Sequence, residues 1–114
     1  MTAITRDELR LKLQEAPGRV LLIDVRDRAD YEAEHIKGAI SVPLTELSMR
    51  AAKCFSASQE IIVYCTSFEC PASSTAAKLL ARAGYANVLD YEGGLMDWKE
   101  AGYQTEAAIN LKAA

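Results

Sequence analysis

The sequence has 114 residues, of which 50% are apolar and 25% are charged. This length and composition fit one compact domain and differ from those of disordered chains. The net charge of −3 and the pI near 5.1 provide no basic stripe for a phosphate backbone and no polybasic patch for anionic lipid. We therefore expect no nucleic-acid partner and no membrane partner.

The N-terminal residues lack the basic start and apolar core of a signal peptide, and no apolar run approaches the roughly 20 residues that span a bilayer. The predicted location is therefore cytoplasmic. Cysteines in that compartment stay mostly reduced, and the odd number of them argues against a structural disulfide framework. The three are Cys54, Cys65 and Cys70.

The predicted elements alternate between helices and short apolar strands. A capping box at Thr5–Glu8 predicts a first helix near residues 6–15, which Pro17-Gly18 ends. The expected strands are residues 20–25, 39–42, 60–64 and 88–91, and the other expected helical segments are residues 28–34, 44–52, 72–83 and 95–101.

This alternation implies parallel pairing in a three-layer α/β/α sandwich with a mainly parallel central sheet. Gly84 is a natural residue to end the helix at 72–83, and Gly93-Gly94 predicts a tight turn. Residues 1–104 are expected to form the single domain. Residues 105–114 are expected to be a C-terminal tail with a weak helical pattern.

Cys65 directly follows the strand predicted at 60–64, at the edge where open parallel sheets place their sites. The loop from there into the next helix directs backbone N–H groups inward, and these favour an anion such as the Cys65 thiolate. A thiol pKa of about 8.5 falls in such surroundings. The alternative is a buried cysteine that acts as a small hydrophobe, but the polar loop that follows favours a reactive thiol.

Five sequence blocks occur in order along the chain. They are Leu22-Ile-Asp-Val-Arg26, His35-Ile-Lys-Gly-Ala-Ile-Ser-Val-Pro43, Ile61-Ile-Val-Tyr-Cys65, Ala83-Gly-Tyr85 and Glu92-Gly-Gly-Leu-Met-Asp-Trp98. In order and spacing they resemble the rhodanese-like domain family. The resemblance covers nearly the whole chain and implies the family's α/β fold.

The resemblance also implies a single-domain sulfurtransferase, expected as a monomer or weak dimer. Cys65 would take sulfane sulfur from thiosulfate, another small donor or a persulfidated protein, and pass it to a thiol acceptor. The loop residues expected to bind the persulfide anion are Thr66, Ser67, Phe68 and Glu69. No metal and no organic cofactor is implied. Asp24, Arg26, His35 and Trp98 are expected to be structural.

The loop departs from the commonest family pattern, Cys-x-x-Gly-x-Arg. Phe68 stands in place of the glycine, whose backbone angles it would adopt only with strain, and Cys70 stands in place of the arginine that would grip thiosulfate or phosphate. Cys65 precedes Gly84 by nineteen residues, about two more than the family's usual spacing, which predicts a longer loop. Such a loop can close without the glycine.

Cys70 lies five residues after Cys65, so a curling loop could bring the two within the ~5.5 Å Cα separation of a disulfide. Three alternatives remain open: Cys70 resolves the persulfide as a second catalytic thiol, the pair is a reversible redox switch in a sensing or binding module with little turnover, or Cys70 packs at the helix start. Zinc is not expected, because two cysteines and one distant histidine supply too few ligands. Cys54 is expected to be a filler.

Overall fold

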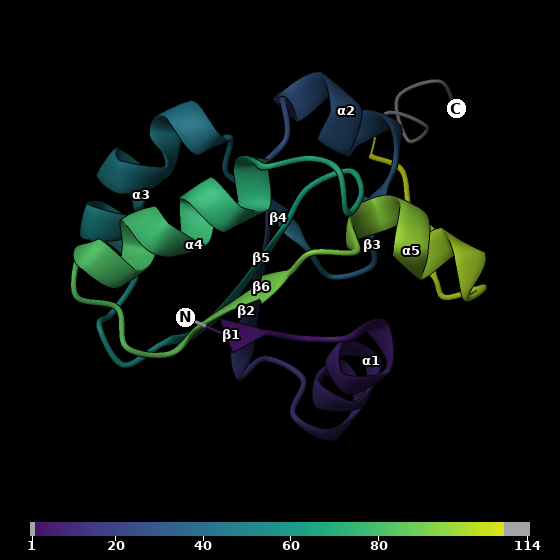
Figure 1. The fold of residues 1–114 in the computed structure, drawn as a ribbon, viewed down its shortest axis with the longest axis horizontal. Helices are drawn as coiled ribbons and strands as arrows, with labels where there is room; N and C mark the ends of the chain where they lie inside the picture. Colours follow the sequence, from purple (N-terminus) through teal and green to yellow (C-terminus); the bar gives the residue numbers. More distant parts are fainter. Residues whose placement is uncertain (1, 109–114) are drawn as a thin grey trace.

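A central sheet of five parallel strands forms the middle layer of the molecule (Figure 1). The computed structural model describes residues 2–108. In spatial order the strands are β1 (Thr2–Ala3), β6 (Val88–Tyr91), β5 (Glu60–Tyr64), β2 (Val20–Asp24) and β4 (Ile40–Ser41). The predicted α/β fold with a mainly parallel sheet is confirmed.

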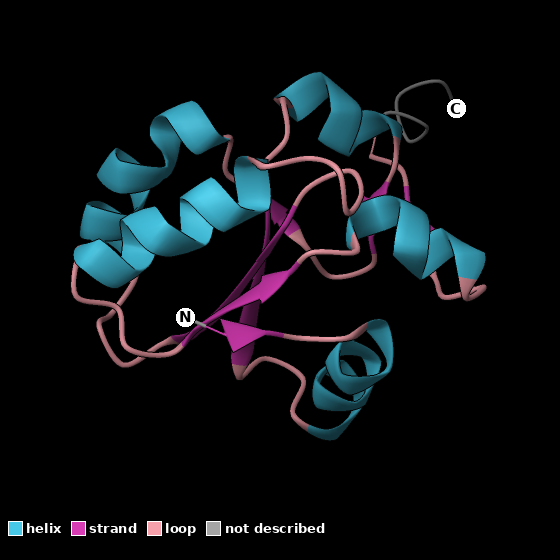
Figure 2. Ribbon diagram, in the orientation of Figure 1, coloured by secondary structure: helices cyan, strands magenta, loops and turns pink. Residues whose placement is uncertain are grey.

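Helices cover both faces of this sheet (Figure 2). On one face lie α3 (Leu47–Cys54) and α4 (Ala72–Arg82), and on the other lies α1 (Arg6–Glu15). The helices near the carboxyl ends of the strands are α2 (Arg28–Ala33) and α5 (Gly94–Glu100). The single helix expected at 44–52 is instead a 3₁₀ turn, η1 (Leu44–Glu46), followed by α3.

Local signals set the helix ends. The Thr5 hydroxyl accepts the Glu8 N–H at 3.3 Å, and the Glu8 carboxylate accepts the Thr5 N–H at 3.0 Å, so the predicted capping box starts α1. At the end of α4, Gly84 follows the C-cap residue with φ of +102°, a conformation that L side chains rarely adopt. Both predictions are confirmed.

Two apolar cores form on the two faces of the sheet because successive strand side chains point in opposite directions. Ile23 and Val63 pack towards α3 and α4, whereas Leu22, Ile62 and Tyr64 pack towards α1 and α5. Strands β2 and β5 pair along all five residues and lie between the other strands. The loops that follow β2 and β5 are therefore attached to the fully paired centre of the sheet.

A second, two-stranded sheet pairs β3 (His35–Ile36) antiparallel with β7 (Thr105–Glu106). The helical tendency expected in the tail is therefore wrong at Thr105 and Glu106, which form a strand. The rest of that expectation falls on residues 109–114, outside the described part of the chain. The domain boundary at residue 104 stays a prediction.

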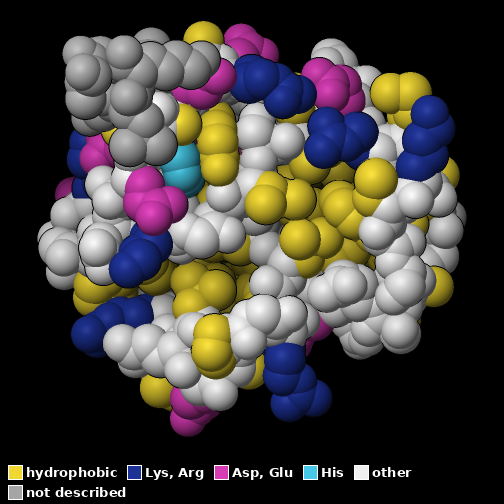
Figure 3. All heavy atoms as spheres, turned by 180° about the vertical axis from the view of Figure 1, so that it is seen from behind, with side chains coloured by type: hydrophobic (Ala, Val, Ile, Leu, Met, Phe, Trp, Pro, Cys, Tyr) yellow, Lys and Arg dark blue, Asp and Glu magenta, His cyan; other side chains and the backbone are white. Residues whose placement is uncertain are grey.

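The reverse face of the molecule carries apolar side chains near its centre, with Lys, Arg, Asp and Glu side chains along its upper border (Figure 3). Within residues 2–108, no helix combines the length and apolar character needed to cross a bilayer. The exposed large apolar side chains are Leu11, Ile40, Met49, Phe68 and Met96.

Candidate active site

The carboxyl ends of the parallel strands meet at one edge of the sheet, where Asp24, Tyr64 and Tyr91 lie in register on neighbouring strands. Cys65 is the first residue after β5 at this edge and is 4% exposed. The chain then loops through residues 66–71 into α4. This placement is the one expected for a functional cysteine of a parallel sheet.

The loop curls so that Cys65 and Cys70 meet. Their Sγ atoms are joined in a disulfide, and their Cα atoms are 6.4 Å apart, within the range of roughly 4.4 to 6.8 Å that disulfides span. Cys70 is partly buried and packs against the core on the α4 side. The two predicted catalytic cysteines are thus brought together, and either sulfur can attack a group carried by the other.

Helix α5 holds the loop from the other side. The N–H of Leu95 donates to the Cys65 carbonyl at 3.1 Å, and the N–H of Met96 donates to the Thr66 carbonyl at 2.9 Å. Gly94 makes this approach possible, because a Cβ there would lie 2.6 Å from the Cys65 carbonyl oxygen. The sequence predicts only a tight turn at these glycines, although adjacent glycines after a strand also signal close backbone approach.

The loop's N–H groups remain largely free. Cys70 N–H donates to the Ser67 carbonyl at 3.1 Å, so it is not available to an anion. Those of Thr66 to Glu69 have no acceptor within residues 2–108. Helix α4 begins after Pro71 without a side-chain cap, and the Thr66 hydroxyl oxygen lies 4.0 Å from Cys65 Sγ. The loop therefore holds unpaired backbone donors next to the start of α4.

Phe68 does not adopt a positive φ, and the prediction that the loop can close without the family's glycine is confirmed. Every non-glycine residue of the described chain has a negative φ, and the long loop closes without the glycine. The Phe68 side chain is 70% exposed and points away from the core. Among residues 2–108, no side chain covers this ring, so its apolar surface is accessible to an incoming molecule.

A buried polar network supports the strand that ends at Cys65. The Asp24 carboxylate, fully buried, accepts hydrogen bonds from Arg26 Nε at 3.0 Å and Nη2 at 2.8 Å, and from the Tyr64 hydroxyl at 2.8 Å. The same hydroxyl accepts the Ile36 N–H at 3.0 Å. Burial, and next the Asp24 charge, raise the pKa of Tyr64, which therefore stays a neutral donor. The hydrogen bonds and ion pair predicted for Asp24 and Arg26 are confirmed.

The remaining residues that the sequence singled out lie in the frame of the domain. His35 is buried, stacks on the Tyr31 ring at 3.7 Å and contacts its carbonyl through Nδ1 at 2.7 Å. Trp98 is buried and donates its indole N–H to the Gln104 carbonyl at 2.9 Å. Both side chains are buried and hydrogen-bonded within the domain, in agreement with the positions expected of structural residues. Cys54 is exposed at the end of α3, so its expected role as a filler is wrong.

Asp90 is a buried acid at this edge that the sequence reasoning missed. It lies in register with Val63 on β5 and is 3% exposed, and its Oδ1 has no partner within the described residues. Burial raises the pKa of the Asp90 carboxyl, the Ser73 hydroxyl lowers it and Glu92 raises it again. The sequence signal that could have found it is an acidic residue within the otherwise apolar strand predicted at residues 88–91, because charged residues are rarely buried.

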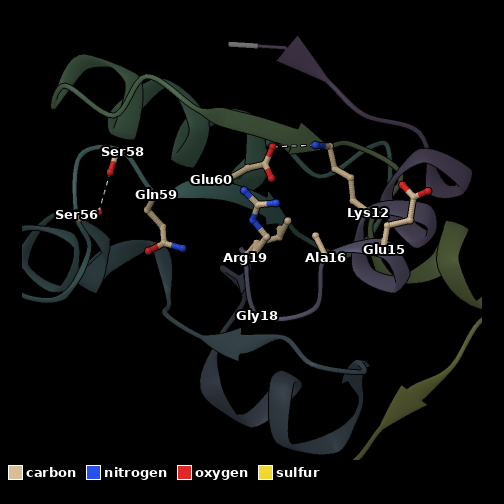
Figure 4. A pocket seen from close by; sticks show the side chains of 10 residues that line it. Lys12, Glu15, Ala16, Gly18, Arg19, Ser56, Ser58, Gln59 and Glu60 are labelled. Atoms are coloured by element: carbon tan, nitrogen blue, oxygen red, sulfur yellow. Dashed lines mark hydrogen bonds and ion pairs between the residues drawn. The ribbon is translucent and has the colours of Figure 1, made fainter.

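A polar hollow of about 560 Å³ lies at the opposite, amino-terminal edge of the sheet (Figure 4). Lys12 of α1 reaches across it to Glu60 at the start of β5, with 2.8 Å between Nζ and Oε2. Arg19 and Gln59 also line it. Because it sits at the far end of β5 from Cys65, it is not part of this site.

The comparisons with known proteins agree with this geometry. The model of the rhodanese-like domain matches residues 5–101. The HTH-type transcriptional regulator Rv0324 of Mycobacterium tuberculosis is 39% identical over 100 residues, covering 88% of this chain and 42% of that protein. The thiosulfate sulfurtransferase PspE of Escherichia coli is 37% identical over 76 residues, covering 66% of this chain and 70% of that protein.

Among solved structures, the rhodanese-like domain of the Anabaena protein Alr3790 superposes with a TM-score of 0.86 at 34% identity, covering 96% of this chain and 82% of that one. The chain spans less than half of the Mycobacterium regulator, so the activity of that whole protein is not transferred to it. The match over residues 5–101, together with the shared architecture, shows that the chain belongs to the rhodanese-like domain family.

Proposed function

We propose that this chain is a sulfurtransferase or persulfide carrier in which Cys65 holds the transferred sulfur. The observation that carries this proposal is the position of Cys65 at the end of β5, in a loop whose N–H groups from Thr66 to Glu69 are free of acceptors within residues 2–108. The family and the thiosulfate sulfurtransferase among its relatives support the same class of reaction.

In the proposed reaction, the Cys65 thiolate attacks the outer sulfur of thiosulfate or of a protein persulfide. A new S–S bond forms, the donor's S–S bond breaks, and sulfite or the donor thiolate leaves with the electron pair. The free N–H groups of the loop stabilise the resulting persulfide anion. An acceptor thiolate then attacks the outer sulfur and restores the Cys65 thiolate. No metal or organic cofactor takes part.

Cys70 provides a second route in this proposal. The outer sulfur of the Cys65 persulfide first takes a proton from water, the Cys70 thiolate then attacks Cys65 Sγ, the persulfide bond breaks, and HS⁻ leaves with the electron pair. The product is the Cys65–Cys70 disulfide, which two electrons from an external dithiol reduce. The contact between the two sulfur atoms supports this step.

Loading of Cys65 tests the proposed function. Reduced protein incubated with polysulfide or thiosulfate is expected to gain the mass of one sulfur atom, measured by intact-protein mass spectrometry. Cys65→Ser removes the nucleophile and is expected to gain none. Cys54→Ser removes an exposed thiol elsewhere and serves as the matched control. Equal loading of the two variants would exclude Cys65 as the carrier.

A second candidate function, favoured by the same Cys65–Cys70 disulfide, is a redox-sensing or binding module with little turnover.

If the chain is a sulfurtransferase in which Cys70 resolves the persulfide, Cys70→Ser is expected to slow hydrogen sulfide release from the loaded protein by about tenfold or more, because no neighbouring thiolate displaces the sulfide. Unchanged release would contradict the resolving role. Fast loss of two free thiols in mild peroxide, with slow donor turnover, would instead favour the redox module.

A further inference from the structure

A cleft of about 330 Å³ lies beside the Cys65 loop, and its walls carry excess negative charge. Phe68 of the loop forms one wall, and the start of α1 and the end of β6 form the others. Among residues 2–108, one cation and three carboxylates line it: Arg6, Asp7, Glu92 and Asp97.

The one cation of this cleft is already paired. Arg6 Nη1 lies 3.2 Å from Asp97 Oδ1 and 3.3 Å from the Asp97 carbonyl oxygen. By contrast, Glu92 is exposed and forms no ion pair within residues 2–108. Glu69 of the loop is also exposed, and the loop contains no Lys or Arg. An incoming group therefore meets a negative potential beside the loop that carries Cys65.

Two large apolar side chains are exposed on or beside the Cys65 loop. Phe68 is 70% exposed and Met96 is 56% exposed. Met96 is fixed beside the loop by its N–H bond to the Thr66 carbonyl. Exposed aromatic and methionine side chains next to a functional group are typical of surfaces that contact another protein.

We propose that the thiol exchanging sulfur with Cys65 belongs to a partner protein and is flanked by apolar and basic side chains, the basic ones facing Glu69 and Glu92. This inference rests on the function proposed above and names its substrate class. The partner thiolate attacks the outer sulfur of the Cys65 persulfide, a new S–S bond forms, and Cys65 leaves as a thiolate. Small dianionic donors such as thiosulfate are the poorer substrates, because the carboxylates repel them.

Two cysteine peptides of equal length test this preference, one with Lys and Phe beside the cysteine and one with Glu and Phe. For each peptide, the rate at which it removes sulfur from the persulfidated protein is measured. This rate is divided by the rate at which the same peptide reacts with a small persulfide in solution, which corrects for the intrinsic reactivity of its thiol. The basic peptide is expected to react about tenfold faster at low ionic strength, and the ratio to fall to about twofold in ~0.5 M salt. Equal rates would overturn the proposal.

Variants locate the effect. Glu69→Gln combined with Glu92→Gln is expected to reduce the ratio to about twofold, whereas Glu15→Gln, which removes a charge at the amino-terminal edge of the sheet, is expected to leave it unchanged. Phe68→Ser is expected to slow both peptides equally. If the ratio of basic to acidic peptide stays near tenfold in the Glu69→Gln, Glu92→Gln variant, these carboxylates do not select the partner and the proposal is contradicted. If cysteamine, a small cationic thiol, reacts as fast as the basic peptide, the acceptor need not be a protein and the proposal is contradicted.

The charge preference is also measured without any sulfur loading. Reduced protein is treated with a trimethylammonium or a sulfonate methanethiosulfonate, and modification of each cysteine is followed by peptide mass spectrometry. Cys54, exposed on α3, is the internal reference. The ratio of the modification rate with the cationic reagent to that with the anionic reagent is expected to be about tenfold higher at Cys65 than at Cys54. Failure of persulfide loading alone would reject the proposed function, and equal reagent ratios at both cysteines would reject this inference.

Discussion

Gly94→Ala is expected to lower the rate of sulfur loading on Cys65 by about a hundredfold, because a displacement of roughly 1 Å at a reacting group has an effect of that order. The added Cβ would lie 2.6 Å from the Cys65 carbonyl oxygen, 2.7 Å from the Thr66 carbonyl carbon and 2.8 Å from the Ser67 nitrogen. All three are backbone atoms, so the loop itself must move. The movement breaks the two hydrogen bonds that hold the loop on α5.

The same change is expected to lower the free energy of unfolding by about 2–4 kcal/mol, from the left-handed backbone and the overpacking together. Gly102→Ala is the matched control, since Gly102 has φ of +78° against +66° for Gly94 but no atom within 4 Å of the added Cβ. It is expected to cost about 1 kcal/mol and to leave loading unchanged. Urea unfolding and loading kinetics measure both effects. Similar loading rates in the two variants would show that α5 does not position the loop.

The sequence predicts the parts of the fold that local patterns determine. The ends of α1 follow from its capping box and from Pro17, and β5 follows from an apolar run bounded by polar residues. Strand β7 escapes this reasoning because its two residues pair with His35–Ile36, about 70 positions earlier in the chain. A strand of two residues has no period to detect, and only its tertiary partner defines it.

The same division holds at the candidate site. The position of Cys65 is predictable because a strand end and a helix start are both local signals. The docking of α5 on the loop is not, since the positive φ of Gly94 and its contact with Cys65 arise only when distant segments meet. The backbone of Phe68 is likewise set by the length of the whole loop, which is why the family's glycine is dispensable here.

Asp24→Asn is expected to lower the free energy of unfolding by about 3–5 kcal/mol, the usual cost of leaving one member of a buried ion pair alone. The Asp24 side chain is fully buried and that of Arg26 is 9% exposed, so water cannot replace the lost charge. Glu46→Gln is the matched control, because Glu46 pairs with Arg28 on the surface at 3.1 Å, with side chains 39% and 47% exposed. It is expected to cost less than about 1 kcal/mol.

Asp24→Asn is also expected to lower the rate of sulfur loading on Cys65. The Asp24 carboxylate accepts the hydroxyl of Tyr64, the residue before Cys65, so the change loosens the support of the loop. Adding Arg26→Met to Asp24→Asn is expected to restore about 1–2 kcal/mol of stability, because it removes the unpaired charge. It should not restore loading, which depends on the Tyr64 contact. If Asp24→Asn costs no more than Glu46→Gln in urea unfolding, the buried Asp24–Arg26 pair does not stabilise this edge of the sheet.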